Sequence, residues 1–410
     1  MIAERDVNGL SAWLAEAGLN GMSEDALVSG FCERSNAIGL PINRCLVLID
    51  TLHPVYEGRL VRWGHEASQP GIVEYGRTVV PEGLVLGADE EKAAESWRKS
   101  PFFYMLQTGE RLLRLNEEHA ALFPAMQDYI AAGMKGGVAI VNRFAPEGVI
   151  GEMDAVYSSW MTRRPGGFDD THVEMLARLI PTLALAVKTV ALTRMTGTLM
   201  QTYLGRDAAR RVLSGRIMRG VAERIDAAIW FSDLRGFTRV TDSAPEQVLP
   251  LLNDYADVVI SAINAEGGDV LKLIGDGILA IFTAEDRAGA CGAALNAATA
   301  ARREVAALNA RRAQALLPVT DMYIGLHVGE VLYGNIGSVD RLDFTVVGPA
   351  VNEASRIAAM CRSVEQPVLV SQSFAAVDGM RGRLVSVGRY ALRGVERPQE
   401  LFTLESIAGS

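Results

Sequence analysis

The pattern of apolar and polar positions differs between the first and the last part of the chain. Up to about residue 167, SEDALVSGFCERSNAIG (23–39) places apolar residues at helical spacing, whereas CLVLID (45–50), GVAIVN (137–142) and MDAVYSSW (153–160) read as short apolar strands. This mixture of helix and strand signals predicts a first α+β domain over residues 1–167.

A narrow apolar stripe follows in residues 166–193. Its members recur at alternating steps of four and three residues, which predicts a helix with one apolar edge; they are Leu176, Ile180, Leu183, Val187 and Val190. Such an edge suits either pairing with a second copy of the helix or packing on its own domain. Gly197, Gly205 and Gly215 are expected to interrupt the helix, so residues 168–225 are assigned to a signalling helix and linker.

From Asp226 onward, strands alternate with helices. DAAIWFSD (226–233) reads as a buried strand, and VLKLIGDGILAIF (270–282) reads as a hairpin around a Gly-Asp-Gly turn. Helices are predicted over 245–268, over the alanine-rich stretch 286–315 and in NEASRIAAMC; further strands lie in MYIGLHVG, DFTVV, VLVS, LVSVGRY and ELFTLE. The pattern predicts a second α+β domain over residues 226–410.

Composition and charge narrow the classes of function. A hydrophobic content of 49% with 22% charged residues is typical of globular proteins. The net charge of -9 argues against nucleic acid or an anionic membrane surface as a partner, and a phosphate-bearing substrate would need metal ions and local cations. The four cysteines form no CxxC pair and no disulfide framework, which favours a cytoplasmic location.

The chain also lacks an obvious targeting segment. Its acidic start predicts no secretory signal. The most apolar helical stretch, between Arg178 and Lys188, is shorter than the roughly 20 residues of a membrane span. The sequence therefore predicts no transmembrane segment.

Two aspartates stand where strands end. Asp233 closes the strand 226–233, and Asp276 occupies the Gly-Asp-Gly turn. Carboxylates in such places suit Mg²⁺, which prefers oxygen ligands and retains substrate phosphates among them. Two of them brought together could hold two metal ions. An aspartate after a strand also serves as a helix cap or turn former, and the residues alone leave that alternative open.

Three segments in this order resemble the class III nucleotidyl cyclase domain: FSDLRGFT (231–238), KLIGDG (272–277) and FTVVGPAVNEASRI (344–357). The resemblance covers residues 226–405, and TYLGRDAARRVLSG (202–215) is similar to the lead-in that often precedes such domains. It implies a ferredoxin-like βαββαβ palm core. It also implies a reaction in which the ribose 3′-hydroxyl of ATP attacks the α-phosphate, giving 3′,5′-cyclic AMP and pyrophosphate.

The resemblance assigns roles around the phosphates. Asp233 and Asp276 match the metal-binding aspartates, which together with the backbone of Leu234 would hold two Mg²⁺ or Mn²⁺ ions. Backbone N–H groups of a glycine-containing turn, and one arginine where relatives usually carry a lysine, would meet the phosphates; these residues are Gly236, Phe237, Thr238 and Arg393.

The base and the ribose also have matching positions. Lys272 matches the base reader, with Thr345 as its partner. A lysine only donates, and adenine N1 accepts where guanine N1–H donates, so ATP is favoured over GTP. Asn352 and Arg356 lie four apart on one face of a predicted helix, and the resemblance implies that they orient the ribose and stabilise charge on the α-phosphate. The plain alternatives are a solvated lysine, an arginine in a surface salt bridge and an asparagine facing solvent.

The spacing between Lys272 and Asp276 indicates how many chains are needed to form one site. Lys272 precedes Asp276 by four residues on an extended strand, about 13 Å at roughly 3.3 Å per residue, which is awkward for one nucleotide to bridge within a chain. The cyclase family solves this with a head-to-tail dimer, in which one subunit supplies the metals and the other supplies Lys272, Asn352 and Arg356. This chain carries both sets, so a homodimer with two equivalent sites is expected.

The first domain is similar to a GAF domain, a sensor module often fused to cyclases. The similarity rests on its order of helices and strands and on the ending FDDTHVEMLARLIPTLALAV (168–187). It implies an unknown small-molecule or protein effector whose signal passes through the helix at 168–196. His53, His65 and His119 stand alone in the sequence and are expected to be structural or exposed.

Three rival functions stay open. GTP could replace ATP as the substrate. EGGDV (266–270) partly matches the diguanylate cyclase signature, although its acid-aromatic ending is missing. A catalytically inactive nucleotide-binding module would typically lack a metal aspartate or the arginine, whereas Asp233, Asp276, Asn352 and Arg356 are all present.

Overall fold

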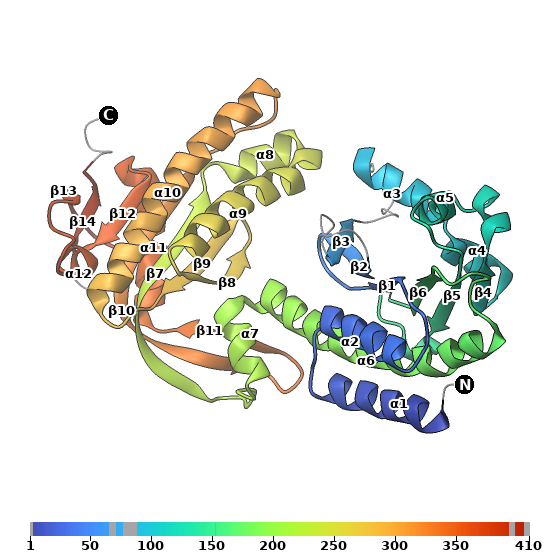
Figure 1. Ribbon diagram of the computed structural model, residues 1–410. Coiled ribbons are helices and arrows are strands. Elements are labelled where there is room, and N and C mark those ends of the chain that lie inside the picture. Colours follow the sequence, from blue (N-terminus) through green and yellow to red (C-terminus); the bar gives the residue numbers. More distant parts are fainter. Residues whose placement is uncertain (1–2, 65–70, 77–87, 152, 393–397, 406–410) are drawn as a thin grey trace. The chain divides into compact units, whose positions relative to one another are not determined.

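The computed structural model describes residues 3–64, 71–76, 88–151, 153–392 and 398–405 (Figure 1). They fall into two compact units, Met1–Leu199 and Met200–Ser410. Both units combine helices with one sheet, so the mixed α and β content expected from the sequence is confirmed.

The first unit is built on a six-stranded antiparallel sheet with the order β3-β2-β1-β6-β5-β4. Its strands are β1 (Arg44–Asp50), β2 (Tyr56–Trp63), β3 (Ile72–Gly76), β4 (Leu112–Leu115), β5 (Gly136–Arg143) and β6 (Ala155–Thr162). The central strand β6 is buried at every position because helices cover both faces of the sheet. The strands predicted at 45–50, 137–142 and 153–160 are confirmed.

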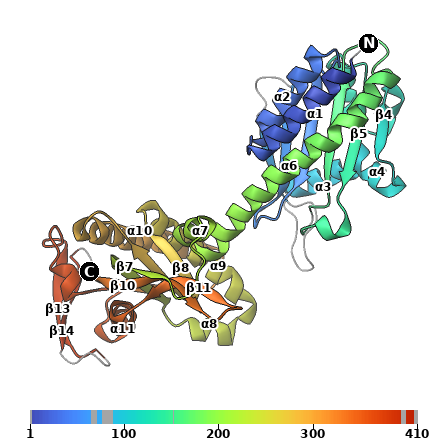
Figure 2. The ribbon, with the colours of Figure 1, turned by 90° about the horizontal axis from the view of Figure 1, so that it is seen from below.

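Two helical layers cover that sheet. Figure 2 shows α1 (Glu4–Leu19), α2 (Glu24–Ala37) and α6 (Asp170–Leu204) together, and their apolar side chains share one core with the sheet. The other face carries a second core with residues of the shorter helices. These helices are α3 (Ala88–Arg98), α4 (Pro101–Thr108), α5 (Ala125–Ala131) and the 3₁₀ turn η1 (Glu117–Ala121). A second 3₁₀ turn, η2 (Pro146–Gly148), contacts Lys188 of α6 instead.

Helix α6 differs from its prediction in length. It continues through Gly197 and ends only at Gly205, which adopts φ 84°. A single glycine costs a helix only about 1 kcal/mol, too little to break one whose neighbours keep bonding. The predicted apolar stripe packs on its own unit: Leu176, Ile180, Leu183 and Val187 are buried, and Val190 is half-buried.

The length of α6 also corrects the expected shortness of the apolar stretch. By length and composition alone, α6 could cross a membrane, with an 18-residue window of mean hydropathy 1.6. Half of that window is buried inside the protein. A buried core helix passes the same test, so this is weak support for a span.

The second unit contains an eight-stranded sheet with the order β13-β14-β12-β10-β7-β9-β8, and β11 pairs with β10. Its strands are β7 (Ala222–Leu234), β8 (Asp269–Ile274), β9 (Gly277–Phe282), β10 (Met322–Gly337), β11 (Leu342–Val347), β12 (Val368–Ser371), β13 (Leu384–Tyr390) and β14 (Gln399–Leu404). The predicted hairpin around the Gly-Asp-Gly turn is confirmed as β8–β9. Strand β10 runs eight residues past the predicted MYIGLHVG because it also pairs with β11.

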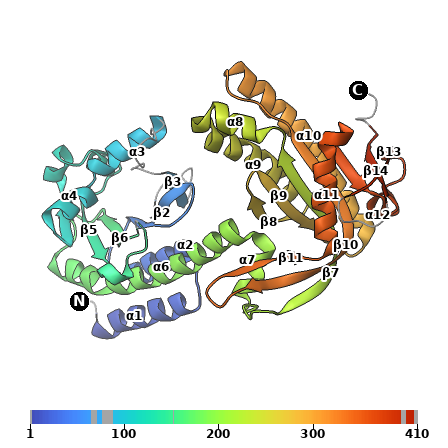
Figure 3. The ribbon, with the colours of Figure 1, turned by 180° about the vertical axis from the view of Figure 1, so that it is seen from behind.

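Alternate side chains of β7 enter two different cores. Ala228 and Trp230 face the core shared with the packed pair α9 (Val248–Ala265) and α10 (Arg287–Gln314) (Figure 3). Ala227 and Ile229 face the core shared with α7 (Arg206–Leu213) and α11 (Pro349–Val364). The period-two alternation therefore fixes which helices cover each face of the sheet. The remaining helices are α8 (Phe237–Ser243), η3 (Pro245–Gln247) and α12 (Gln372–Ala375).

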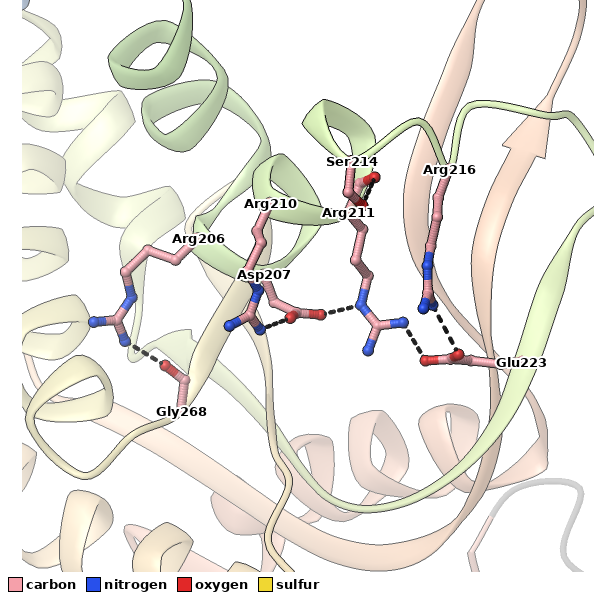
Figure 4. Close-up of polar contacts among 8 residues, drawn as sticks. All are labelled: Arg206, Asp207, Arg210, Arg211, Ser214, Arg216, Glu223 and Gly268. Carbon is pink, nitrogen blue, oxygen red and sulfur yellow. Dashed lines mark hydrogen bonds and ion pairs between the residues drawn. The ribbon is translucent and has the colours of Figure 1, made fainter. Parts of the chain in front are cut away.

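Polar contacts fix α7 to the sheet of the second unit (Figure 4). Asp207, nearly buried, accepts hydrogen bonds from Arg210 and from Arg211, the latter at 2.5 Å. Burial alone would raise the pKa of Asp207, but the hydrogen bonds from these two arginines lower it. Arg211 also pairs with Glu223 at the start of β7 and lies 4.8 Å from the ring centroid of Tyr333. The lead-in segment thus folds as part of the second unit.

The structure brings two of the scattered cysteines together. The Sγ atoms of Cys32 and Cys45 lie 3.5 Å apart in the core of the first unit. All four cysteines are free and buried. The sequence could not show this proximity because it joins α2 to β1 across the core.

Candidate functional site

The fold brings Asp233 and Asp276 together. Asp233 lies near the end of β7, and the pairing of β7 with β9 sets that end beside the turn carrying Asp276. The backbone N–H of Leu234 donates to Asp233 Oδ1 at 3.2 Å and to Asp276 Oδ2 at 3.3 Å. One N–H group therefore binds both carboxylates.

A glycine permits this close approach. A Cβ atom at Gly277 would lie 2.9 Å from the carbonyl oxygen of Ser232 and 3.8 Å from Asp233 Oδ1. Any other residue would push the turn away from the end of β7. The Gly-Asp-Gly sequence thus serves the carboxylate pair as well as the hairpin.

The pair carries an electrostatic cost. Partial burial and the adjacent Asp276 raise the pKa of Asp233 from 3.8 to about 6. Two carboxylates held together by a shared N–H are a donor set for a hard cation such as Mg²⁺ or Mn²⁺. No group of three or more His, Cys, Asp and Glu side chains forms a metal cluster in the part of the chain that the structure describes. Backbone or substrate oxygens would therefore have to complete the coordination.

The turn after β7 has the backbone needed for an anion. Gly236 adopts φ 70°, a left-handed conformation that suits glycine, and α8 begins at Phe237. The N–H of Arg235 is bonded to the carbonyl oxygen of Asp321 at 2.7 Å. Because the first N–H groups of a helix have no partner inside it, those of Phe237 and Thr238 are the ones a phosphate could meet.

Two predicted phosphate contacts cannot be placed. Arg393 lies outside the described residues. The side chain of Thr238 is likewise outside what the structure describes, although its backbone belongs to α8.

Lys272 has a partner that sequence reasoning missed. Its Nζ forms an ion pair with the carboxylate of Asp343 on β11. Thr345, two residues further along β11, is buried, and its Oγ1 has no hydrogen-bond partner within the described residues. A bulge between Val270 and Lys272 interrupts the regular register of β8 and re-aims the lysine. The useful sequence signal was alternation, since Asp343 and Thr345 occupy the same face of a strand.

Helix α11 carries the remaining pair. Asn352 is exposed and Arg356 is half-buried, on one face of the helix. The opposite face packs closely on β10: a Cβ at Gly325 would lie only 2.4 Å from the backbone nitrogen of Ala358. Pro349 occupies the first turn, as expected from its fixed φ. The expected site residues thus stand in three groups: the carboxylate pair, Lys272 with β11, and α11.

The first unit contains a cavity of about 1090 Å³ on the sheet face under α3 to α5. Its walls are largely aromatic and aliphatic, including Trp97, Phe102 and Tyr157. The hydroxyl of Tyr157 donates to Asp154 at 2.7 Å, and burial is the main cause that raises the pKa of Tyr157. A pocket of this size and character suits a small organic molecule.

His53 and His119 have structural roles in the first unit. Nδ1 of His53 accepts from the backbone N–H groups of Val55 and Tyr56. His119 belongs to a capping box at Asn116. His65 lies outside the described residues.

Comparison with known proteins finds a family match in the second unit. Residues 221–406 match the family model for the adenylate and guanylate cyclase catalytic domain. An uncharacterized protein of Mycobacterium tuberculosis is 32% identical over 207 residues, which are 48% of this chain and 36% of that protein. The adenylate cyclase of Anabaena cylindrica is 35% identical over 159 residues, 38% of this chain and 31% of that enzyme. The matches thus span about a third of the length of these curated relatives.

Several solved structures also resemble part of this chain, among them an adenylyl cyclase. The adenylyl cyclase CyaB from P. aeruginosa is 26% identical, with 45% of this chain and 95% of that chain covered, at a TM-score of 0.42.

Proposed function

We propose that this protein, whose residues 221–406 form an adenylate and guanylate cyclase catalytic domain, converts ATP to 3′,5′-cyclic AMP and pyrophosphate. The observation that carries the proposal is that Asp233 and Asp276 both accept a hydrogen bond from the backbone N–H of Leu234. Carboxylates are brought so close, against their mutual repulsion, where a divalent cation is to be held.

Each group has a task in this reaction. Asp233, Asp276 and the backbone of Leu234 would hold two Mg²⁺ or Mn²⁺ ions, which supply charge neutralisation and activation of the attacking hydroxyl. The turn at Gly236 binds phosphate through N–H groups. Asn352 orients the ribose, and the fork of donors on Arg356 stabilises charge on the α-phosphate as its bond to the 3′-oxygen forms and pyrophosphate leaves.

ATP is the proposed substrate because Lys272 is a donor and adenine N1 is an acceptor. GTP is the second candidate, and one specific observation favours it: the acid beside Lys272. Asp343 offers an acceptor for the N1–H of guanine. Product formation from each nucleotide decides between them.

The proposed active form is a head-to-tail homodimer in a cytoplasmic setting. Support comes from the extended spacing of Lys272 and Asp276 on β8 and from the separate location of Asn352 and Arg356 on α11. Free, buried cysteines are consistent with a reducing compartment. Each site would draw metal ligands from one chain and α11 from the other.

The test is an assay of purified protein with ATP or GTP and with Mg²⁺ or Mn²⁺. Asp233→Ala and Arg356→Lys should each lower activity at least about a hundredfold. The first removes a charge and the second displaces one, and both charges are positioned to stabilise the transition state. Asp340→Ala, a change to an exposed carboxylate in the β10–β11 turn, is the matched control and should be active.

Mixing inactive variants examines the shared site. Asp233→Ala with Arg356→Ala should regain activity, because each heterodimer holds one intact site. Full activity of Asp233→Ala alone would refute the metal role. Inactive mixtures of two folded, dimeric variants would refute the shared site.

The first unit is proposed to be a GAF-like regulatory domain that binds a small-molecule or protein effector. Its cavity of about 1090 Å³ supports the small-molecule form of this proposal. A chain reduced to residues 200–410 should keep cyclase chemistry and lose the response to any effector of the full chain. An unchanged response would exclude regulation by the first unit.

A further inference from the structure

The loop between α10 and β10, residues 315–321, binds the turn that follows β7. The N–H of Arg235 donates to the carbonyl oxygen of Asp321 at 2.7 Å. The hydroxyl of Thr320 donates to the carbonyl oxygen of Arg235 at 2.5 Å. Two neighbouring residues of the loop thus hold both backbone polar groups of Arg235.

These two bonds set the direction of two successive peptide groups. A trans peptide group is planar, and its C=O and N–H point in opposite directions; the described residues contain no cis peptide bond. Because the N–H of Arg235 points to Asp321, the carbonyl of Leu234 points away from the loop. Because the carbonyl of Arg235 points to Thr320, the N–H of Gly236 also points away from it. These are backbone groups of the segment assigned to the metal ions and the phosphates.

Thr320 is itself held by a closed ring of hydrogen bonds. Its N–H donates to the hydroxyl oxygen of Tyr255 on α9 at 2.8 Å. That hydroxyl donates to the side-chain oxygen of Asn309 on α10, and Nδ2 of Asn309 donates to the carbonyl oxygen of Thr320 at 2.7 Å. Every donor in this ring meets an acceptor, so the backbone of Thr320 has one well-defined position.

Burial makes this ring costly to rearrange. Tyr255 is 1% exposed and Thr320 is 9% exposed, and a buried polar group that loses its partner is poorly compensated by water. Asp321 is fixed as well, since its carboxylate accepts from the N–H of Met322 at 2.8 Å and pairs with Arg302 on α10. The loop is therefore a rigid support for the turn.

We infer that Thr320, Tyr255 and Asn309 are positioning residues for the proposed reaction. Their polar groups are used within the ring, and they act through Arg235 by directing one carbonyl towards the metal ions and one N–H towards the phosphates. This inference rests on the proposed function. It requires that a change at Thr320 alters phosphate binding although Thr320 itself does not contact the phosphates.

Thr320→Val removes the hydroxyl and nearly keeps the shape of the side chain, whereas Thr320→Ser keeps the hydroxyl. Calorimetry with inorganic triphosphate and Mn²⁺ measures binding at the turn without catalysis. In Thr320→Val the dissociation constant should rise at least about threefold, as expected for the loss of one hydrogen bond. The kcat/KM for ATP should fall at least about tenfold, because misplaced reacting groups cost more than weakened binding. Thr320→Ser should keep both values close to wild type.

A matched control lies in the same unit. The hydroxyl of Thr403 on β14 is fully buried and donates to the carbonyl oxygen of Val368 at 2.8 Å. Strands β12 and β10 separate β14 from β7. Thr403→Val therefore removes the same kind of hydrogen bond away from the turn. It should lower the melting temperature, as Thr320→Val does, and leave the triphosphate dissociation constant and kcat/KM unchanged.

The alternative is that Thr320 only stabilises the fold. Thr320→Val, assayed below its melting temperature, would then keep wild-type values of both quantities, which overturns the inference. Equal losses in Thr403→Val overturn it as well. If Thr320→Val fails to fold, Tyr255→Phe replaces it: this change removes the hydroxyl that holds the N–H of Thr320 and should raise the same dissociation constant, and an unchanged constant counts against the inference.

The result can be separated from that of the proposed function. If wild-type protein makes no cyclic nucleotide but binds triphosphate with Mn²⁺, the proposed function fails, and the dissociation constants of the variants still decide the positioning role. If wild-type protein binds no triphosphate, the turn is no phosphate site and the inference fails with it.

Discussion

The carboxylate pair can be tested through stability, without any assay of catalysis. Asp276→Asn keeps the shape of the side chain and removes one charge beside Asp233. Burial and Asp276 give Asp233 a pKa of about 6 in place of 3.8. At about 1.4 kcal/mol per pKa unit this corresponds to roughly 3 kcal/mol at pH 7. Burial is the larger cause of the shift and stays in the variant, and solvent screening weakens the part due to Asp276 because Asp233 is partly exposed. This leaves roughly 1 kcal/mol of repulsion.

The sign of the pH dependence follows from linkage. The folded pKa of Asp233 is raised, so its favourable contribution is complete below pH 3.8 and is lost as the pH rises through about 6. At pH 5 the pair already shares a proton, and replacing one acid changes little. At pH 7 Asp233 is largely ionised beside Asp276, and Asp276→Asn should melt about 2–4 °C above wild type in EDTA.

Scanning calorimetry in EDTA at pH 5 and pH 7 measures this difference. The melting temperature is compared because a chain of two units need not unfold in one step. Mn²⁺ should then raise the melting temperature of wild type and have little effect on the variant. Asp340→Asn should behave as wild type throughout. An Asp276→Asn variant that melts below wild type at pH 7, or that differs equally at both pH values, refutes the repulsion.

Four further substitutions test the contacts that support the site. Gly325→Ala should lower both the melting temperature and cyclase activity by displacing α11, since its Cβ would lie 2.4 Å from the nitrogen of Ala358; normal values for both would contradict the close packing. Asp207→Asn removes the charge that binds Arg210 and Arg211 and should cost about 1–3 kcal/mol, measured as a lower melting temperature. A Cβ atom added at Gly205 would lie 2.4 Å from the backbone oxygen of Val270. Gly215 has a similar φ, but a Cβ atom added there has no neighbouring atom within 4 Å. Gly205→Ala should therefore melt lower than Gly215→Ala, and equal melting would argue against the contact.

Local sequence patterns predicted much of the second unit. The β8–β9 hairpin, the alanine-rich α10 and the strand β7 that carries Asp233 could be predicted because each has a strong local period or turn signal. The nearness of Asp233 and Asp276 was expected only from family resemblance. Its physical cause, the room left by Gly277 beside Ser232, is a contact between separate segments and has no local signature.

Other features escaped prediction for similar reasons. Asp343 was overlooked because an acid on a strand reads as an ordinary exposed residue until β11 lies beside β8. The length of α6 was underestimated because a single glycine was given too much weight against a helix stabilised by packing. The cavity of the first unit depends on how α3 to α5 lie over the sheet, which no periodicity of the sequence specifies.

The placement of Trp230 has a practical consequence. It is the single tryptophan of residues 200–410, and the other four lie in the first unit. Its indole is fully buried, and Nε1 donates to Ser232 Oγ at 2.9 Å, one residue before Asp233. Replacing the other four would leave one intrinsic fluorophore on the strand that carries an acidic ligand. Its emission would then record optically, and without an added dye, whether an ion has entered.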